Sequence, residues 1–431
     1  MYLFEKALLI AIPAFSLLIF MEYLYGHWKG NDAYANKADG ISSLLSGLSS
    51  IISNVVGIGV LMVSYEWLHG HVAIFELSSS HWWVWVLAII CWDFSSYWVH
   101  RWAHENGFLW ANHVIHHSSE HFNLAVALRQ QTFKWVSYQP LLMLPVALLG
   151  VPVEVVALTS TVMLFMAYWY HTPHIRKFTG IWSWLEYIIV TPSQHRVHHA
   201  INDIYIDKNY AGIFCVWDRW FGTFQEELDD EPCVYGCLGP VRTWDPMKIE
   251  LRYIGNMLRD AIFTKNWGDK IRVFTAHTGW RPADVAERWP GPYISDYKNF
   301  ERYRPTVPAW LEWWGFTELL SIAAAALYLF ATIETIAPNP WLLFSFVAIA
   351  LLSISSLAAL LEGRAGWLPA IGRVALMAYV VIETGSLFGL PSPAFAAVIA
   401  YVALSLGIRL QRQLAISSGQ PAVNTQINAT V

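Results

Sequence analysis

The sequence predicts an all-α, multi-pass membrane protein with a histidine-rich, metal-binding catalytic cap on the cytoplasmic side of the bilayer. Of the 431 residues, 55% are hydrophobic and 14% are charged, whereas a soluble domain has about 25% charged residues. The 24 Trp, 20 Tyr and 22 Phe residues suit a protein with many membrane interfaces, where aromatic rings settle at headgroup level. A net charge of −5 without a basic stripe argues against nucleic acid as a partner.

Apolar runs long enough to cross a bilayer as helices, about 20 residues each, recur along the chain. The first run has no small-residue cleavage site, so we expect it to be retained in the mature protein. The run at 135–170 is broken by prolines and a glycine, which predicts a hairpin of two spans or a re-entrant pair. The other expected spans are 7–25, 43–66, 82–99, 314–336, 341–361, 367–389 and 393–409.

These runs divide the chain into four parts. Residues 1–99 are expected to form N-terminal transmembrane helices. Residues 100–310 form the catalytic region, which contains the hairpin and a long polar and aromatic segment at 171–310. Residues 311–410 form the C-terminal transmembrane helices, and the small, polar residues 411–431 are expected to be a disordered tail.

Lysine and arginine residues predict the orientation, because they favour the cytoplasmic side of a membrane. They occur in the segments after the first and third spans and throughout 171–310, and Arg409 and Arg412 follow the last span. The loops on the other side contain none. We therefore expect an outside N-terminus, with the 171–310 segment and the C-terminus in the cytoplasm, at a bacterial inner membrane or the endoplasmic reticulum.

The histidines are grouped in a way that predicts a metal site. Eleven of the 16 lie between His100 and His199, in the patterns HRWAH at 100–104, HVIHH at 113–117 and HRVHH at 195–199. Residues spaced i, i+3 and i+4 share one face of a helix, so each HxxHH triplet directs three imidazoles toward one point. One ion takes about four to six ligands, and these clusters offer more than that, which indicates two ions.

The histidine pattern leaves the metal open, since imidazole binds iron, zinc and copper. The HExxH motif of a zinc protease is absent, because Asn-Gly-Phe follows His104-Glu105. A bis-histidine cytochrome needs single histidines deep within spans, whereas these histidines lie at span ends. A metal transporter or sensor stays open as an alternative, although transporters place their ligands near the middle of the membrane.

From about Asp93 to Glu227 the chain resembles the fatty acid hydroxylase (sterol desaturase) superfamily of membrane di-iron enzymes. Within it, the chain is most similar to the alkylglycerol monooxygenase family. The stretches HHSSEHFNLAVALRQ and IDKNYAG are particular to that ether-lipid branch, and His121 and His174 depart from its pattern. The stretches that carry the resemblance are 93–105, 116–130, 191–212 and 217–224.

The spacing and the resemblance together give nine candidate metal ligands. His171 is included because the superfamily supplies one histidine between its second and third boxes. His174 is expected at the edge of the site or on the surface, His121 in an ordinary polar role, and the histidines outside this region, His277 among them, at the membrane interface. The candidate ligands are His100, His104, His113, His116, His117, His171, His195, His198 and His199.

Three carboxylates are candidate catalytic groups. Asp93 lies within a span, where a charged group is costly and by default functional. We expect it to accept the free N–H of a ligating imidazole, or to contact only Ser95 or Tyr97. Glu105 and Glu120 follow ligands closely and are expected to bridge the metals, hold a proton or assist oxygen cleavage, with a solvated helix face as the alternative for Glu105.

Six further residues recur in the ether-lipid pattern and are expected to bind the cofactor or support its pocket. For Asp207 and Asn209, loop capping is an equally good interpretation. The aromatic residues of WDRWFGTF at 217–224 are expected to pack at the membrane interface. The six cofactor-binding candidates are Asn123, Arg129, Gln130, Asp207, Asn209 and Tyr210.

The resemblance implies an O₂-dependent di-iron monooxygenase acting on a membrane lipid. Two iron ions and O₂ would hydroxylate the carbon next to the ether oxygen of an alkylglycerol, with electrons from a tetrahydropterin. The alternative within the superfamily is a sterol desaturase or fatty acyl hydroxylase that takes its electrons from a separate donor protein. The sequence leaves the exact lipid, the electron donor and the oligomeric state open.

Overall fold

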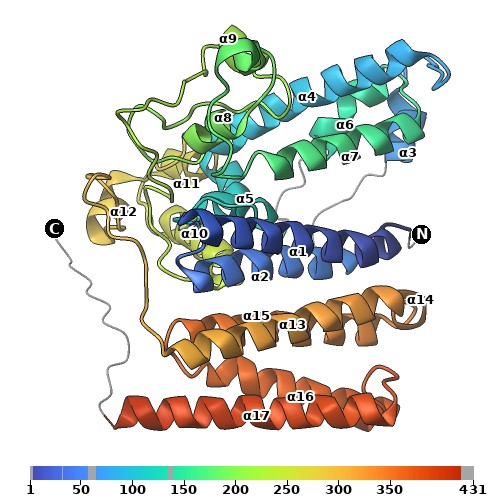
Figure 1. Cartoon of the computed structure of the whole chain (residues 1–431), viewed down its shortest axis with the longest axis vertical. Coiled ribbons are helices and arrows are strands. Elements are labelled where there is room, and N and C mark those ends of the chain that lie inside the picture. Colours follow the sequence, from blue (N-terminus) through green and yellow to red (C-terminus); the bar gives the residue numbers. More distant parts are fainter. Residues whose placement is uncertain (1–2, 32, 57–64, 134–138, 419–431) are drawn as a thin grey trace.

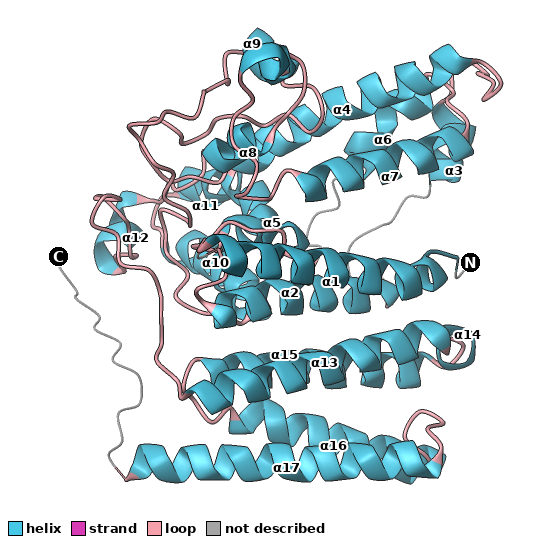
Figure 2. Cartoon of the chain, viewed as in Figure 1, coloured by secondary structure: helices cyan, strands magenta, loops and turns pink. Residues whose placement is uncertain are grey.

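The computed structural model describes residues 3–31, 33–56, 65–133 and 139–418. Within these ranges the regular structure is helical, apart from one isolated bridge between Ala200 and Tyr235. Figure 2 shows long helices lying side by side in layers, with most of the loops gathered at one end. The prediction of an all-α fold is therefore confirmed.

Six described helices are long and apolar enough to cross a membrane. Large apolar side chains such as Leu320 and Ile382 are exposed on their outer faces, which suits contact with lipid rather than water. The chain is an integral, multi-pass membrane protein. The six helices are α1 (Leu3–Lys29), α4 (Trp82–Glu105), α13 (Ala309–Ala331), α15 (Pro340–Leu361), α16 (Trp367–Thr384) and α17 (Ser392–Ser417).

The expected span at 43–66 is only partly correct. Helix α2 begins at Lys37 and ends at Val55, most of its residues are buried, and it is not among the apolar candidates. Its serines bond to other segments: the Ser42 hydroxyl donates to the carbonyl of Trp244 at 2.8 Å, and that of Ser53 to the carbonyl of Thr132 at 2.6 Å. Because these hydroxyls are satisfied within the protein, a serine-rich helix can occupy its interior. Residues 57–64 lie outside the described ranges.

The run at 135–170 forms the expected hairpin. Helices α6 (Gln139–Leu148) and α7 (Val153–Trp169) are joined by a turn at Gly150. Helix α6 has 10 residues, about 15 Å of helix, which is half of a hydrocarbon core of roughly 30 Å. The hairpin packs with α3 (Tyr65–Val72) against α4, and residues 134–138, directly before α6, lie outside the described ranges.

Gly150→Ala is expected to destabilise this hairpin strongly. Gly150 has a φ of +70°, and an added Cβ would lie 1.6 Å from the carbonyl oxygen of Phe75. The loss should exceed the roughly 1–2 kcal/mol of a left-handed residue alone, measured as a lower unfolding temperature in detergent. Gly180→Ala is the matched control, since its φ is +63° and nothing lies within 4 Å of its Cβ position. Equal losses for both variants would contradict the steric explanation.

The cap lies at one end of the helical bundle (Figure 1). Helices α3 and α14 (Ile333–Ile336) lie at the opposite end, where α1 begins. The loops that contain no Lys or Arg also lie at that far end, so the distribution of basic residues among the loops agrees with the arrangement of the helices. The cap contains α5 (Gly107–His117), α8 (Pro192–His198), α9 (Val216–Trp220), α10 (Pro246–Phe263), α11 (Trp267–Thr275) and α12 (Ala283–Arg288).

The expected disordered tail at 411–431 is wrong in its first part, because α17 continues to Ser417. Arg409 and Arg412 were expected to follow the last span, but both belong to this helix and are buried, with 0% and 7% of their surfaces exposed. Residues 419–431 lie outside the described ranges.

Candidate metal centre

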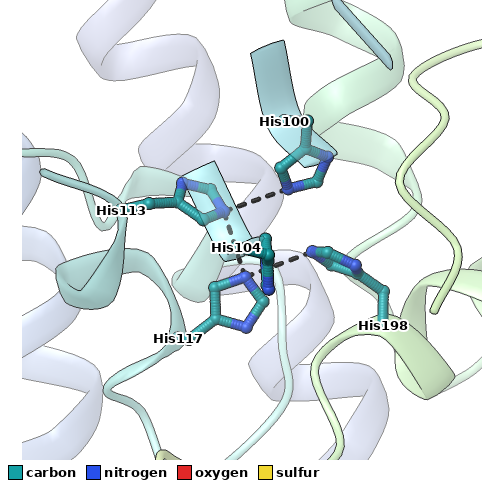
Figure 3. A group of neighbouring side chains, drawn as sticks. All are labelled: His100, His104, His113, His117 and His198. Carbon is teal, nitrogen blue, oxygen red and sulfur yellow. Dashed lines mark hydrogen bonds between the residues drawn. The ribbon is translucent and has the colours of Figure 1, made fainter. Parts of the chain in front are cut away.

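Nine buried or half-buried histidines form two adjacent groups in the cap. The ligand atoms within each group all lie within 4.8 Å of one another. The rings of His117 and His199 link the two groups by stacking at a centroid distance of 4.3 Å. The nine residues are those expected from the sequence, and the fold divides them between two sites. Group A contains His100, His104, His113, His117 and His198 (Figure 3), and group B contains His116, His171, His195 and His199.

In group A the rings converge through their Nε2 atoms (Figure 3). The Nε2 of His113 lies 3.0 Å from that of His100 and 3.1 Å from that of His117, and the Nε2 of His198 lies 3.1 Å from that of His117. Group B is built in the same way. The Nε2 of His171 lies 2.9 Å from that of His195. The other Nε2 separations in group B, from His171 to His116 and His199 and from His195 to His199, are 3.3, 3.2 and 3.0 Å.

Backbone carbonyls fix the opposite nitrogen of several rings. The Nδ1 of His100 lies 2.8 Å from the carbonyl oxygen of Tyr210, and that of His198 lies 3.0 Å from the carbonyl of Lys208. In group B, His171 Nδ1 pairs with a carbonyl on α7 at 2.7 Å. A carbonyl only accepts, so each Nδ1 carries the proton and Nε2 presents a lone pair. Lone pairs facing one another at about 3 Å repel, and a cation between them relieves that repulsion.

Burial keeps these imidazoles neutral. Burial lowers the pKa of His116 to about 4 and lowers the pKa of His113, His171 and His199 well below the ordinary value. A metal binds the neutral form of imidazole, so a low pKa leaves the ligand atom free of protons at neutral pH. The donor set, all nitrogen and largely shielded from water, fits transition-metal ions.

A tight turn between α4 and α5 brings the first two histidine boxes together. Asn106 separates the helices, and its side-chain oxygen accepts from the backbone N–H groups of Phe108 and Leu109, both at 3.0 Å. This N-cap at Asn106 starts α5 in a new direction. The face of α4 with His100 and His104 therefore meets the face of α5 with His113 and His117. Helix α8 supplies the third box.

The loop at 207–212 supports group A. Asp207 and Asn209 have φ values of 56° and 57°, and this bend presents the carbonyls of Lys208 and Tyr210 to two ligand histidines. The amide of Asn209 donates to the carbonyl of Gln194 at 3.0 Å, and the Asp218 carboxylate accepts from the N–H of Tyr210 at 2.7 Å. The loop-capping interpretation of Asn209 is therefore the one that the contacts favour.

Asp93 has partners other than the expected imidazole. Its carboxylate accepts from the backbone N–H groups of Ile213 and Phe214 at 2.7 and 2.9 Å, and from the indole N–H of Trp217 at 2.9 Å. These partners include no ligating imidazole; the Nδ1 of His100, two helical turns further along α4, bonds to the carbonyl of Tyr210. Asp93 thus connects α4 to residues 213–217, which follow the 207–212 loop. Trp217 therefore has a second role beside the expected aromatic packing, as a hydrogen-bond donor to Asp93.

Asp93→Asn is expected to loosen this attachment and destabilise the protein by about 1–3 kcal/mol, because an amide leaves at least one of the three buried donors without an acceptor. Asp296→Asn is the matched control. Asp296 also accepts three donors, from Lys298 and Asn299, but is exposed. Unfolding temperatures in detergent should fall for the first variant and stay within about a degree for the second. A similar fall for both would contradict the role of burial.

Glu105 and Glu120 do not join either histidine group. Glu105 forms an ion pair with Arg101 on the same helix at 2.8 Å. Glu120 accepts from the backbone N–H of Tyr303, and burial raises its pKa to about 7. The structure therefore shows neither carboxylate between the two groups.

Three of the expected cofactor-binding residues have internal partners. Arg129 is buried and pairs with Asp39 at 2.7 Å. The amide of Asn123 donates to the carbonyl of Ala33 at 2.8 Å. Gln130 is exposed and its side chain bonds only within its own loop. The contacts of Arg129 and Asn123 hold the 118–133 segment against α2 and the loop before it. The carbonyl of Arg129 accepts from His116 Nδ1 at 3.2 Å.

Three residues without an expected role at the site, His277, Trp110 and Tyr170, border the histidine groups. Asp207 lies 3.7 Å from the Nδ1 of His104 and 3.8 Å from the Nε2 of His277, so a histidine that was expected at the membrane interface lies at the edge of group A. Aromatic rings close the sides: Tyr170 lies 4.1 Å from His195 between centroids, and Trp110 lies 5.0 Å from His104. Neither aromatic residue stands in a motif that would have identified it.

His174 and His121 belong to neither group. The ring of His174 packs edge-on against Tyr25 of α1, 4.9 Å away between centroids. Its Nε2 is buried and has no hydrogen-bond partner.

The helical bundle and the paired histidine groups define an integral membrane protein of the histidine-box class. A family model described as fatty acid hydroxylase matches residues 85–223, which include all nine histidines. No solved structure matches the chain.

The chain is also similar to full-length relatives. It is 32% identical over 364 residues to the alkylglycerol monooxygenase of Xenopus tropicalis, covering 84% of this chain and 77% of the relative. The enzyme of Danio rerio is 34% identical over 70% of this chain and 65% of its own length. The human enzyme is 33% identical, over 63% of this chain and 59% of its own length. The chain belongs to the alkylglycerol monooxygenase family, which indicates an oxidoreductase of the monooxygenase class.

Proposed function

We propose that this protein is a di-iron monooxygenase that cleaves the ether bond of alkylglycerol lipids, with a tetrahydropterin as the electron donor. One atom of O₂ enters the C–H bond next to the ether oxygen, and two electrons and two protons reduce the other atom to water. The resulting hemiacetal separates into an aldehyde and a glycerol. Iron, when bound, supplies the activation of O₂.

The observation that carries this proposal is the division of nine histidines into two adjacent groups whose Nε2 lone pairs converge. Two sites separated by one ring stack, between His117 and His199, suit the cooperation of two ions on one O₂ molecule. The membership in the alkylglycerol monooxygenase family supports the lipid substrate and the reaction class.

The protein's own residues orient the ligand histidines and shield the metal centre from water. The carbonyls of Lys208 and Tyr210 hold two ligand rings in one tautomer. Trp110 and Tyr170 cover the sides of the groups and exclude water. The membrane helices next to the cap would keep the chains of a lipid in an apolar environment while its ether bond reaches the histidines. The excess of basic residues on the cap side supports a cytoplasmic location for the site.

The test is turnover by the purified, iron-loaded protein. We expect an alkylglycerol to be converted to the aldehyde only when O₂ and a tetrahydropterin are both present, with one aldehyde formed per O₂ consumed. His81→Ala, which removes an exposed histidine at the far end of the bundle, serves as the matched control for ligand variants. Turnover of a sterol or fatty acyl lipid with a reductase and no pterin would reject this proposal in favour of the other superfamily reaction.

Metal transport is the remaining alternative, and an uptake measurement tests it. Uptake of zinc into vesicles without O₂ consumption would favour a transporter. About two iron ions per chain together with O₂ uptake that depends on the lipid would exclude it.

A further inference from the structure

The C-terminal helices bury a polar cluster that is separate from the metal centre. It lies between α13, α15, α16 and α17, and each helix contributes at least one side chain. Among these side chains, Glu318, Ser356, Ser405 and Arg409 are 0% exposed and Arg373 is 2% exposed. Such groups are rare inside membrane bundles and mark functional sites by default.

Every acceptor side chain of this cluster already has at least one donor. Arg409 donates to Glu318 Oε2 at 3.2 Å and to the Ser356 hydroxyl at 2.6 Å. The Ser405 hydroxyl donates to Glu318 Oε1 at 2.5 Å and accepts from Arg373 at 2.6 Å. Both carboxylate oxygens of Glu318 therefore already have donors, and both serine hydroxyls accept an arginine N–H.

The donors, in contrast, exceed the acceptors. In the described part of α13–α17, four buried side-chain atoms have no hydrogen-bond partner, and each is an N–H group. A buried donor without an acceptor costs about 1–3 kcal/mol, so the same deficit on three helices indicates a missing acceptor. The four atoms are Trp314 Nε1, Arg373 Nε, Arg409 Nη1 and Arg412 Nη2.

The charges have the same imbalance. Arg373, Arg409 and Arg412 are buried. The buried carboxylate of Glu318 faces Arg373 and Arg409, and Arg412, one turn further along α17, bonds to the carbonyl of Gly363. The other buried carboxylate of these helices, Glu362, pairs with Arg364 and accepts from the N–H of Trp244. These helices thus bury three guanidinium groups, and their two buried carboxylates are Glu318 and the already paired Glu362. An excess of buried positive charge is costly in a membrane without a further anion.

The unpaired donors lie toward the cap side of the bundle. Trp314 is five residues after the start of α13 at Ala309, and Arg412 is five residues before the end of α17 at Ser417. Both helix ends lie at the cap end (Figure 1). At 1.5 Å per residue, these side chains are about 8 Å from the helix ends, near the depth at which headgroups meet the hydrocarbon core.

We propose that this cluster binds one phosphate group, presented by a phospholipid of the cap-side leaflet. A phosphate offers several anionic oxygens, and the planar guanidinium fork matches it with paired hydrogen bonds. Basic pockets between transmembrane helices on the cytoplasmic side bind anionic lipid headgroups in this way. The inference goes beyond the proposed function, because the cluster contains no metal ligand and the bound lipid is not the substrate.

Binding would also explain how α17 is held. Its only buried residues among those described are Val402, Ser405, Arg409 and Arg412, so three of its four inward side chains are polar. In lipid there is little hydrophobic drive between helices, and polar contacts carry their association. An anion between Arg373 of α16 and the two arginines of α17 would join these helices.

The experiment measures bound phosphorus and thermal stability, and needs no enzyme activity. The full-length protein is delipidated in a non-ionic detergent and mixed with dioleoylphosphatidylglycerol, with inorganic phosphate, or with dioleoylglycerol, which has the same chains and no phosphate. We expect the phospholipid to raise the unfolding temperature by several degrees and to remain bound at about one phosphorus per chain, and the dioleoylglycerol to do neither.

The variants separate binding from folding. Arg409→Gln would remove the closer of the two ion pairs of Glu318, at 3.2 Å, whereas Arg373 lies 3.9 Å from that carboxylate. Arg412→Gln is therefore the most informative change, since Arg412 bonds to the carbonyl of Gly363, and Arg373→Gln is the second. Each should weaken the apparent affinity for the phospholipid at least tenfold. Arg304→Gln, an exposed arginine just before α13, removes the same charge and should leave the affinity unchanged.

The three ligands distinguish the source of the phosphate. Stabilisation by inorganic phosphate that is lost in Arg412→Gln would keep the phosphate site and assign it to the free ion. Equal stabilisation by dioleoylglycerol, equal affinity of all variants, or no retained phosphorus would each overturn the proposal.

Discussion

His198→Ala is expected to abolish turnover and to remove about half of the bound metal. His198 is the group A ligand that comes from α8, and its Nε2 faces that of His117 at 3.1 Å. Changes to residues that only hydrogen-bond a ligand typically lower metal affinity or activity 10–100-fold, so loss of the ligand itself should lower turnover by more than about 100-fold. Metal content by mass spectrometry and aldehyde formation measure the two effects.

His116→Ala tests the division into two groups. His116 belongs to group B, where its Nε2 lies 3.3 Å from that of His171. Its loss should remove the other half of the metal and leave the group A ion bound, with turnover abolished as well. The exposed His81 again supplies the control. Full metal content in either variant, or loss of all metal in both with normal folding, would contradict two separate sites.

Replacing Arg129 by methionine is expected to cost about 3–5 kcal/mol of stability. The guanidinium pairs with Asp39 at 2.7 Å and donates to the hydroxyls of Ser43 and Ser118 at 2.9 and 2.8 Å. Both charged partners are buried, so removal of one leaves an uncompensated charge in the interior. Unfolding free energies from denaturant titration in mixed micelles measure the loss.

Two further variants isolate the cause of that loss. Lys37→Ala breaks the half-exposed pair with Glu312 at 3.0 Å and should cost about 1 kcal/mol or less. The double variant Arg129→Met with Asp39→Leu removes both charges and should recover much of the stability, because an apolar pair of similar volume has no buried charge to compensate. If the double variant is as unstable as Arg129→Met alone, the buried carboxylate is not the cause.

The candidate ligands could be predicted because their geometry is local. His113, His116 and His117 are on one short helix, and the spacing of three and four residues alone places their rings on one face. Apolar runs are equally local, and for this reason six of the expected spans correspond to described helices that are candidate spans. The expected hairpin was found at α6 and α7. The serine-rich α2 is not among the apolar candidate spans, and its burial within the protein could not be told from the sequence, because burial inside a protein and burial in lipid favour similar side chains.

The roles of the carboxylates could not be predicted, because their partners are distant in sequence. Asp93 bonds to Ile213 and Phe214, 120 and 121 residues away, and Arg129 pairs with Asp39, 90 residues away. A recurring motif shows that such a residue matters to the fold or the site, but the motif cannot say whether it holds a cofactor or another segment. Asp207 beside His104 and His277 is another contact of this kind.

By itself, the sequence determined that this protein is an integral membrane protein and that its three histidine boxes can each direct imidazoles toward one point, since hydrophobic run length and helical periodicity are properties of contiguous residues. The tertiary structure alone decided which five histidines form one site and which four form the other. That division depends on the angle between α4 and α5 and on the approach of α8. It also decided that the C-terminal arginines face inward, because only the packing of four separate helices sets the partners of a buried charge.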